Sequence, residues 1–579
     1  MDWLRLPRFG RDTIWVYITA TVVGLAALSK FRQRALDYTY SETHCYQSLR
    51  TNIEDGSEAN CFTVSPTGKF SKVFRAGSES KLAQNVDAGY AMPGLWDGHG
   101  HLLQYGEFLN SVDLFGSESM DTVRSRIRSY IREHPEAGSE SEWVRGIGWD
   151  QMALGSMPTA SDLAADEELK GLYIMLDRVD VHCIWVSQAV LDLLPKSIPD
   201  VPGGEIIRDP AMGVFCDNAM DMVMELWPKP NKSKKRNFLR SAMEKLNEVG
   251  IVGMHDAGVT PGNLNLFREL AEGEDWTLRV YAMAECDERN TFCPDLVERY
   301  ASPDGFLSIQ SVKLFADGAL GSWGSALIDP YSDRPDTSGS LLVNASELTY
   351  QAVAWANEGY QVNIHAIGDL ANRHAIDAMT AALRLLCPGQ PMSLCQAYHR
   401  FRIEHSQIIH VDDQARMHAI GIIPSIQPTH ATSDMAYAEK RLGPERTRSE
   451  AYRMRSLLEI NPILGSDFPV EPPDPFQGIY AAVTRRNPHT GRGTDDAPDG
   501  WYTDEALTLD QAIRGFTEGP AFGGFTRGKT GVVKPGAFAD WVVLDKRIED
   551  MDIEALRSVK VRETWVGGKR VYSRDEALI

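Results

Sequence analysis

The sequence predicts an α/β fold in which a barrel of parallel strands gathers a site at the carboxyl ends of its strands. Apolar segments typical of strands recur along the 579-residue chain, and several of them end in a side chain that can bind a metal ion. In the middle of the chain these segments alternate with amphipathic stretches such as 348–358 and 372–386, as in repeated βα units. Because the carboxyl ends of the strands of a barrel meet at one face, we expect the candidate ligands to lie together there.

The first strand end carries two histidines, His99 and His101, one residue apart. Successive side chains of a strand point to opposite faces, so both imidazoles can turn toward one metal ion. Neutral imidazole is a common zinc ligand. Asp97 shares their face, and we expect Gly98 and Gly100 to let the backbone approach the ion closely. The pair predicts a metal site if later strands supply further ligands.

Three later strand segments end in the same way, with His365, His405 and Asp467. A fourth places Lys313 among apolar neighbours. Taken singly, each histidine has a simpler interpretation as a hydrogen-bonded core residue, and Lys313 as the partner of Asp317 in an ion pair. The order of a histidine pair, a lysine, two single histidines and an aspartate, each at a strand end, instead favours one shared metal site.

On these residues the chain resembles the amidohydrolase superfamily, and within it the amidohydrolase 3 (YtcJ-like) family, which includes enzymes of the N-substituted formamide deformylase type. The resemblance extends from about residue 91 to about residue 572 and keeps the motif order of the family. Its motifs here are PGLWDGHGH (93–101), GWD (148–150), DRVDVHCIWVS (177–187), VKLFADGALGS (312–322), NIHAIGD (363–369), RIEHSQ (402–407), GSDFPV (465–470) and GVVKPGAFADWVVLD (531–545). It implies a metal-dependent hydrolase built on a TIM-like (β/α)8 barrel.

The resemblance also implies the ligands of one or two divalent metal ions. His99, His101 and Asp467 would hold the more buried metal, and His365 and His405 would hold the second. We expect zinc, with manganese or iron as the alternatives.

By the same resemblance, Lys313 would bridge both metals as a carboxylated lysine, a carbamate formed with carbon dioxide. A free ammonium in an apolar strand is costly and tends to lose its charge, which favours this role. Not every branch of the superfamily uses the bridge.

The implied reaction is hydrolysis of a non-peptide, amide-type carbon–nitrogen bond in a small molecule. Metal-bound water ionises near neutral pH. Asp467 would take its proton as general base and pass it to the leaving nitrogen as general acid. Because the second metal would stabilise the oxyanion, we expect no separate oxyanion donor.

Other functions are weighed against this reaction. An ester or lactone is the alternative substrate, because the same hydroxide attacks either carbonyl. A membrane-tethered pseudoenzyme used as a binding scaffold is the alternative from another class. A serine triad is set aside, because the nucleophile-elbow pattern Gly-x-Ser-x-Gly is absent from the chain.

The resemblance divides the rest of the chain into domains. Residues 93–528 would form the barrel, with an insertion at about 110–245 that covers the mouth of the site. Residues 35–92 and 529–579 would pair as a small composite β-sandwich beside the barrel, although strands are hard to recognise in the first of these segments.

Two residues of the insertion, Trp149 and His182, fall in family motifs, and the resemblance implies that each lines the substrate pocket. The alternatives are a core aromatic for Trp149 and a structural histidine that caps a strand for His182. His255 also ends a strand, and we expect it to support the site, because the ligand set is complete without it.

Residues 1–34 form a separate element around the apolar run 13–29. Spanning a bilayer takes about 20 apolar residues, with a range of about 17–25, so the run is at the lower limit. Arg5, Arg8 and Arg11 precede it, as in the basic region of a signal sequence. We expect one N-terminal hydrophobic helix that anchors the protein in a membrane. Secretion after signal cleavage and an ordinary globular helix are the alternatives.

The net charge of the chain indicates the kind of partner it binds, and its cysteines indicate the compartment in which it lies. The net charge of −21 argues against nucleic acid, which requires a basic surface, so a small-molecule substrate is the expected partner.

Three pairs among the eight cysteines are near neighbours in sequence: Cys45 and Cys61, Cys286 and Cys293, and Cys387 and Cys395. Such spacing suits local disulfides in a secretory lumen, with scattered buried thiols as the alternative. The sequons at Asn231 and Asn344 agree with a luminal or extracellular catalytic domain. No feature indicates an oligomeric state.

Overall fold

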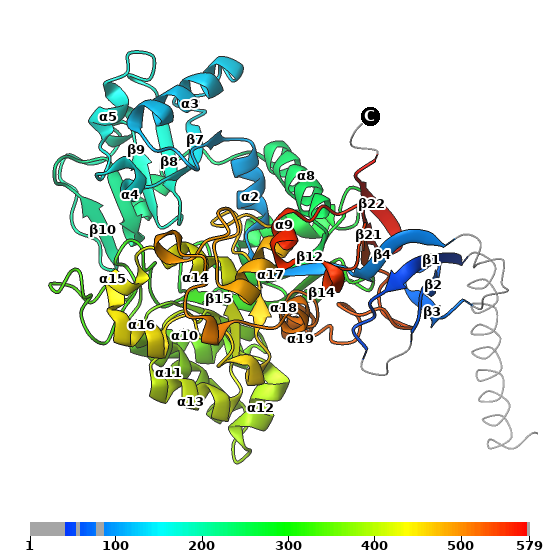
Figure 1. Cartoon of the computed structure of the whole chain (residues 1–579). Coiled ribbons are helices and arrows are strands. Elements are labelled where there is room, and N and C mark those ends of the chain that lie inside the picture. Colours follow the sequence, from blue (N-terminus) through cyan, green and yellow to red (C-terminus); the bar gives the residue numbers. More distant parts are fainter. Residues whose placement is uncertain (1–40, 54–57, 77–85, 576–579) are drawn as a thin grey trace, which may run out of the picture.

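The computed structural model describes residues 41–53, 58–76 and 86–575. Figure 1 shows a central barrel, a sheet with helices at its upper left, and a second sheet at its right. The apolar run 13–29, predicted to be an anchor or signal, lies outside the described residues. Within the described ranges, no helix has both the length and the apolar character required to cross a bilayer.

The barrel consists of eight parallel strands in the described part of the chain. They follow one another in the sheet in the order β5 (Leu95–Gly100), β12 (Ile251–Val259), β13 (Arg279–Ala284), β15 (Leu307–Phe315), β16 (Gln361–Ala366), β17 (Arg402–His405), β18 (Ile423–Ile426) and β19 (Ile463–Leu464). A short strand, β14 (Tyr300–Ala301), is added antiparallel to β15. The ring is nearly closed: Gly100 and Phe468 form a parallel bridge, and the backbone N–H of Asp467 donates to the carbonyl of His99 at 2.7 Å.

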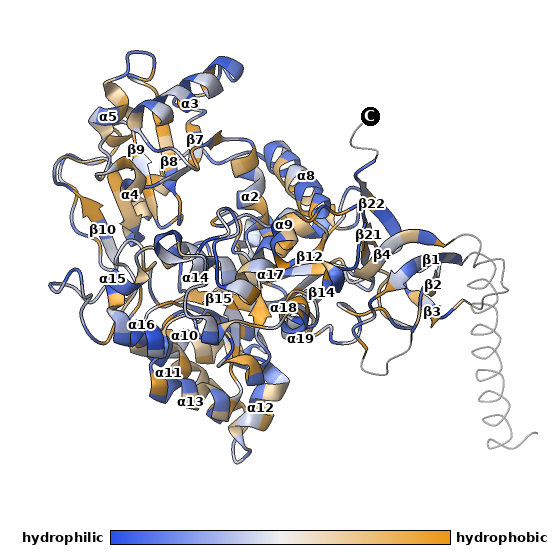
Figure 2. Cartoon of the chain, viewed as in Figure 1, coloured by the Kyte–Doolittle hydropathy of each residue, from blue (hydrophilic) through white to orange (hydrophobic). Residues whose placement is uncertain are grey.

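The barrel strands are apolar because helices cover their outer face. Every residue of β12 except one, and every residue of β16, is buried, as expected for parallel strands packed on both sides. The predicted stretches 348–358 and 372–386 belong to helices α10 (Ala345–Asn357) and α11 (Asp369–Leu386), which pack on each other outside the strands. Figure 2 shows hydrophobic residues concentrated along the strands and hydrophilic residues along the outer helices and loops.

Two glycines of β5 allow this closure. A Cβ added at Gly98 would lie 2.2 Å from a side-chain carbon of Ile463 and 2.6 Å from the carbonyl oxygen of Leu464, both in β19. A Cβ added at Gly100 would lie 2.3 Å from the ring of Phe468. These glycines let β19 and the turn after it pack against β5, and their expected role in a close approach to an ion stays a prediction.

The insertion has its own sheet and core. Six strands lie in the order β10 (Gly204–Ile207), β11 (Val214–Asp217), β9 (Cys183–Val186), β8 (Ile174–Arg178), β7 (Val144–Trp149) and β6 (Val112–Asp113). The sheet is inserted between α2 (Leu102–Leu109) and α8 (Lys232–Glu248), two helices that pack together beside the barrel. A disulfide between Cys183 and Cys216 joins β9 to β11.

The second sheet combines the two ends of the described chain. Its seven strands form one continuous path, β22 (Lys569–Ser573), β21 (Glu563–Val566), β20 (Trp541–Leu544), β4 (Asp87–Pro93), β1 (Glu42–Leu49), β2 (Cys61–Val64) and β3 (Phe70–Phe74). Strand β1 pairs with β2 through its first half and with β4 through its second half. Aromatic side chains such as Phe62, Phe70 and Trp541 fill the core between these strands.

All eight cysteines are paired in disulfides, which excludes the alternative of scattered thiols. The bonds join Cys45 to Cys61, Cys183 to Cys216, Cys286 to Cys293 and Cys387 to Cys395. Three of the four are the neighbouring pairs that the sequence predicts.

Candidate metal centre

Asp467 lies in the middle of the residues predicted to bind metal. It follows β19, and its Oδ1 is 3.4 Å from Nε2 of His99 and 3.2 Å from Nε2 of His101. Its Oδ2 is 4.0 Å from Nδ1 of His405. The histidine ring of His365 is 4.4 Å from that of His405, measured between centroids. The structure thus brings these five residues together at the carboxyl face of the barrel.

Three donor atoms form the tightest group. One from each of His99, His405 and Asp467 lie within 4.8 Å of one another, and all three residues are buried. The resemblance implies that His99 and Asp467 bind the more buried metal and that His405 binds the second. This group therefore contains expected ligands of both metals. The assignment of each ligand to one metal or the other stays a prediction.

The unpartnered nitrogens of the site fit a metal ion. Nε2 of His99, Nε2 of His365 and Nδ1 of His405 are buried and have no hydrogen-bond partner among the described residues. Burial lowers the pKa of His99 to about 4 and holds the pKa of His365 and of His405 well below the usual range. The imidazoles are therefore neutral and present lone pairs. Together with a carboxylate they are a donor set that zinc prefers.

A buried pair fixes the orientation of His99. Nδ1 of His99 is 2.5 Å from Oε2 of Glu404, which also accepts a hydrogen bond from Arg402. Burial would raise the pKa of Glu404, but the charge of Arg402 and the neighbouring His99 hold it well below its ordinary value. Because a carboxylate only accepts, the proton of His99 must be on Nδ1, which leaves the Nε2 lone pair for a metal. Arg402 also donates to Nδ1 of His255 at 2.6 Å, in agreement with the supporting role expected for that residue.

Lys313 is buried beside the centre without an ion-pair partner among the described residues. Its side chain is 2% exposed, and Nζ donates only to the carbonyl of Ala257, at 3.3 Å. The ion pair with Asp317 does not form, because that carboxylate accepts backbone N–H groups of Ile367, Gly368 and Ala326. Burial lowers the pKa of Lys313, which favours the neutral amine that reacts with carbon dioxide.

The backbone is unusual where the ligands leave their strands. His405 and Asp467 have positive φ angles of 73° and 64°, a conformation that is costly for residues other than glycine. Asp97 stabilises the second of these turns: Oδ2 accepts the hydroxyl of Ser466 at 2.6 Å, and Oδ1 accepts the backbone N–H of His99 at 3.0 Å. Asp97 therefore ties β5 to the turn that presents Asp467.

The insertion brings His182 to the site. Its ring lies 5.6 Å from the ring of His365, and Nδ1 is 2.8 Å from Oδ1 of Asp217. Burial lowers the pKa of His182, but the Asp217 carboxylate outweighs that effect and raises it. The side chain is 22% exposed, so His182 has both the contact and the access that substrate binding requires.

Trp149 lies elsewhere. Its side chain is fully buried in the core of the insertion, where the indole packs edge-on against Trp185 and its N–H donates to the carbonyl of Leu176 at 2.9 Å. Trp149 is thus a core aromatic of the insertion, as the alternative interpretation expects.

One further histidine near Asp467 was not predicted from the sequence. His430 belongs to α14 (Pro428–Asp434), directly after β18, and its Nε2 is 3.8 Å from Oδ2 of Asp467. The Gln-Pro-Thr-His run interrupts the strand pattern, so no strand end marks this residue as it marks the others. Its position after the seventh barrel strand is the signal that could have identified it.

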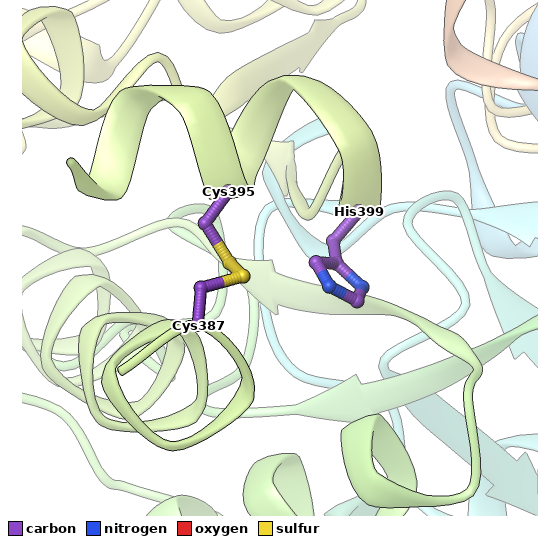
Figure 3. A group of neighbouring side chains, drawn as sticks. All are labelled: Cys387, Cys395 and His399. Atoms are coloured by element: carbon purple, nitrogen blue, oxygen red, sulfur yellow. A yellow bond between two sulfur atoms is a disulfide. The ribbon is translucent and has the colours of Figure 1, made fainter. Parts of the chain in front are cut away.

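A second cluster of possible ligands is not a metal site in this form. Cys387, Cys395 and His399 lie together on the outside of the barrel, and Figure 3 shows the two sulfur atoms bonded to each other. Thiolates bind metals, whereas disulfide sulfurs do not offer that charge. The disulfide joins the carboxyl end of α11 to the middle of α12 (Met392–His399).

Comparison with known proteins agrees with this geometry. The model of the Amidohydrolase family matches residues 85–572. The chain is 25% identical to the putative amidohydrolase YtcJ of Bacillus subtilis, over 90% of this chain and 96% of that protein. It is 25% identical to N-substituted formamide deformylase of Arthrobacter pascens, over 88% and 93%. It is 27% identical to the protein LONG AFTER FAR-RED 3 of Arabidopsis thaliana, over 87% and 86%.

A solved structure shares the fold. An uncharacterized metal-dependent hydrolase from Pyrococcus horikoshii superposes with a TM-score of 0.69 at 23% identity, covering 89% of this chain and 99% of that one.

Proposed function

The chain belongs to the amidohydrolase family, and we propose that it hydrolyses the carbon–nitrogen bond of a small-molecule amide at the centre around Asp467. The observation that carries this proposal is the convergence of buried imidazole nitrogens without partners on one ionised carboxylate. Structural histidines normally satisfy both nitrogens, because an unpaired buried polar atom costs about 1–3 kcal/mol.

We assign the binding of one or two divalent metal ions to this centre. His99, His101 and His405 would hold the ion or ions together with Asp467, and His365 lies against His405 as a further ligand. Zinc is the first ion to test, with manganese and iron as alternatives.

Lys313 completes the proposed ligand set. Its amine is buried and has no carboxylate partner among the described residues, as carbamate formation requires, and its strand β15 is the neighbour of β16, which carries His365. As a carboxylated lysine it would supply the bridging oxygens between two ions.

In the proposed reaction, a bound metal would lower the pKa of water so that hydroxide forms at neutral pH. It would also act as a Lewis acid toward the carbonyl group. Burial would raise the pKa of Asp467, but His99 and His101 lower it to about 2, so the carboxylate is ionised and accepts the proton of the attacking water. The same carboxyl then gives this proton to the leaving nitrogen. His182, which is partly exposed beside His365, would contact the substrate, with Asp217 fixing its ring.

N-substituted formamides are the first substrate class to test, because one relative at 25% identity carries that activity in its name. The experiment is a panel of N-formyl, N-acetyl and longer N-acyl amines, with matched esters and lactones, assayed with the zinc- or manganese-loaded protein. Amide turnover that disappears with a chelator and returns with metal is the expected result. Hydrolysis of the esters alone would favour the ester reaction, and no turnover of any member would count against this substrate range.

We also propose that the catalytic part lies in the secretory lumen or outside the cell, tethered by the N-terminal segment or released from it. Four disulfides require an oxidising compartment in most organisms. Both sequon asparagines, Asn231 and Asn344, are exposed at helix N-termini, where a glycan on Nδ2 would leave Oδ1 free to cap the helix. Protein expressed in a eukaryotic secretory host should lose mass on treatment with an N-glycosidase. An unchanged mass together with free thiols would contradict this location.

A further inference from the structure

His430 lies beside the metal centre but is not among the expected ligands. Its Nε2 is 3.8 Å from Oδ2 of Asp467, and its ring is stacked on that of His405 with 6.0 Å between centroids. The residue is 8% exposed, and Nε2 has no hydrogen-bond partner within the described ranges. Because a buried donor without a partner costs free energy, this atom is placed for a group that enters the site.

The second ring nitrogen of His430 sets the position of its proton. Nδ1 is 3.4 Å from Nε2 of Gln407, and a side-chain amide nitrogen only donates hydrogen bonds. Nδ1 therefore accepts, and the ring proton is on Nε2. His430 presents an N–H to the centre, whereas His99, whose Nδ1 donates to Glu404, presents a lone pair. The two histidines thus have opposite tautomers: one suits a metal and the other suits an oxygen of the substrate.

Helix α14 holds His430 in place. Asp434 is four residues further on the same face of the helix. Its Oδ2 accepts the hydroxyl of Tyr452 at 2.5 Å, and its Oδ1 accepts the hydroxyl of Tyr437. A donor that stabilises a transition state must be fixed before the reaction begins, and these contacts fix the helix that carries it.

We propose that Nε2–H of His430 donates a hydrogen bond to the carbonyl oxygen of the substrate as negative charge develops on it. The oxygen of water forms a bond to the carbonyl carbon and its proton passes to Asp467. The π electron pair moves onto the carbonyl oxygen, to which His430 donates a hydrogen bond without giving up its proton. That pair re-forms the carbonyl as the carbon–nitrogen bond breaks, and Asp467 protonates the nitrogen. The proposal rests on the proposed function, and it revises the expectation that no separate oxyanion donor is needed.

The test compares two reactions of the zinc-loaded enzyme, hydrolysis of N-benzylformamide and of p-nitrophenyl acetate. Both pass through an oxyanion, but only the amide needs a proton on its leaving group. His430→Ala should lower kcat for both probes by about 10²–10³-fold, as for the loss of one oxyanion donor, with KM little changed and metal content equal to wild type. His430→Gln retains an N–H donor and should recover part of the rate. The control is His418→Ala on α13 (Val411–Ile420), an outer helix, where the imidazole is 29% exposed; it should behave as wild type.

Three outcomes would overturn the proposal. Loss of bound zinc in His430→Ala would make His430 a metal ligand. A defect confined to the amide would make it the acid that protonates the leaving group. Wild-type rates with both probes would remove it from the reaction.

A binding measurement separates this inference from the proposed function. Benzylphosphonate carries a tetrahedral anion, and calorimetry gives its affinity without any turnover. Its Kd should rise about ten-fold or more in His430→Ala and stay unchanged in His418→Ala, because a hydrogen bond to a charged group is lost. Equal affinity in both variants would contradict the role of His430. A wild-type protein that binds zinc and the phosphonate but hydrolyses no amide or ester would instead contradict the proposed function.

Discussion

Each imidazole at the centre takes its chemical role from one neighbour. Glu404 accepts the Nδ1 proton of His99 and leaves a lone pair on the opposite nitrogen. The amide of Gln407 does the reverse for His430 and leaves a donor. Two imidazoles beside the same Asp467 carboxylate can therefore bind a cation and stabilise an anion, and the hydrogen-bond partner decides which.

Asp467→Asn tests the proton transfer at this scale. Asparagine keeps the size of the side chain but cannot take up the proton of water, so kcat should fall by about 10²–10⁴-fold, and further where the lost ligand charge weakens metal binding. Amide turnover and metal content of the variant are the measurements. A rate within a few-fold of wild type, at equal metal content, would contradict the shuttle role of Asp467.

Lys313 provides a separate test, because its amine is buried beside the centre and no carboxylate in the described part of the chain pairs with it. Lys313→Ala should lose activity and part of the metal, and a short carboxylic acid such as propionate should restore some of both by supplying the missing oxygens. Lys313→Arg should be inactive, since a guanidinium stays protonated and cannot form a carbamate.

The opposite result would exclude a carbamate on Lys313. A fully active Lys313→Arg enzyme, with no acid rescue of Lys313→Ala, would leave five ligands and favour a single metal ion.

At the scale of elements, the residues at the ends of barrel strands are the part of the site that the sequence predicts. The spacing of His99 and His101 and the apolar runs before His365, His405 and Asp467 identify residues that the parallel strands then bring together. The sequence does not mark His430, which lies on a helix, or Glu404, an acidic residue inside a buried strand. The partners that define their roles, Gln407 for His430 and His99 for Glu404, lie on other segments of the chain, so no local pattern identifies these two residues.

Other features of the fold depend on contacts between segments that are distant in sequence. Trp149 falls in a family motif, yet it packs into a core that exists only once six strands of the insertion have paired. The predicted N-terminal helix lies outside the described residues. The amino-terminal strands of the second sheet are hard to recognise in the sequence because β2 and β3 have only four and five residues, and because β4 pairs with β20 from the other end of the chain.

Gly98→Ala tests the closure of the barrel. The added Cβ would meet the β19 backbone and Ile463, so the free energy of unfolding should fall by about 1–3 kcal/mol, and the Tm with it. The matched control is Gly262→Ala in α9 (Pro261–Leu270), where a Cβ meets nothing within 4 Å; it should leave the protein as stable as wild type or slightly more so. Equal Tm values for the two variants would mean that β5 and β19 are not in such close contact.

At the scale of the whole molecule, a buried ion pair joins the barrel to the second sheet. Arg279 begins β13, and its Nε is 2.6 Å from Oδ2 of Asp540, just before β20. Both side chains are almost fully buried, and Asp540 also accepts the backbone N–H of Gly567. The sheet formed by the two ends of the described chain is thereby fixed to the strands that carry the site.

Asp540→Ala should destabilise the protein strongly, because it leaves the guanidinium of Arg279 buried without its partner. Removal of one member of a buried pair costs about 3–5 kcal/mol, measured here by denaturant unfolding. The exposed pair of Arg574 and Asp545 supplies the control: Asp545→Ala should cost less than about 1 kcal/mol. A similar small effect for both would show that the two parts of the molecule are not coupled through Arg279.

The metal-dependence of amide hydrolysis is the most direct test of the proposed metal centre. The wild-type protein and a His99→Ala/His101→Ala double variant would be stripped with a chelator, reloaded with zinc, and measured by metal analysis and by turnover of the N-formyl and N-acyl amine panel. The wild type should bind one or two equivalents and recover amide hydrolysis in proportion, while the folded double variant should lose metal and show no turnover. Full turnover by the stripped wild type, or full metal content and activity in the double variant, would contradict the assignment of this centre.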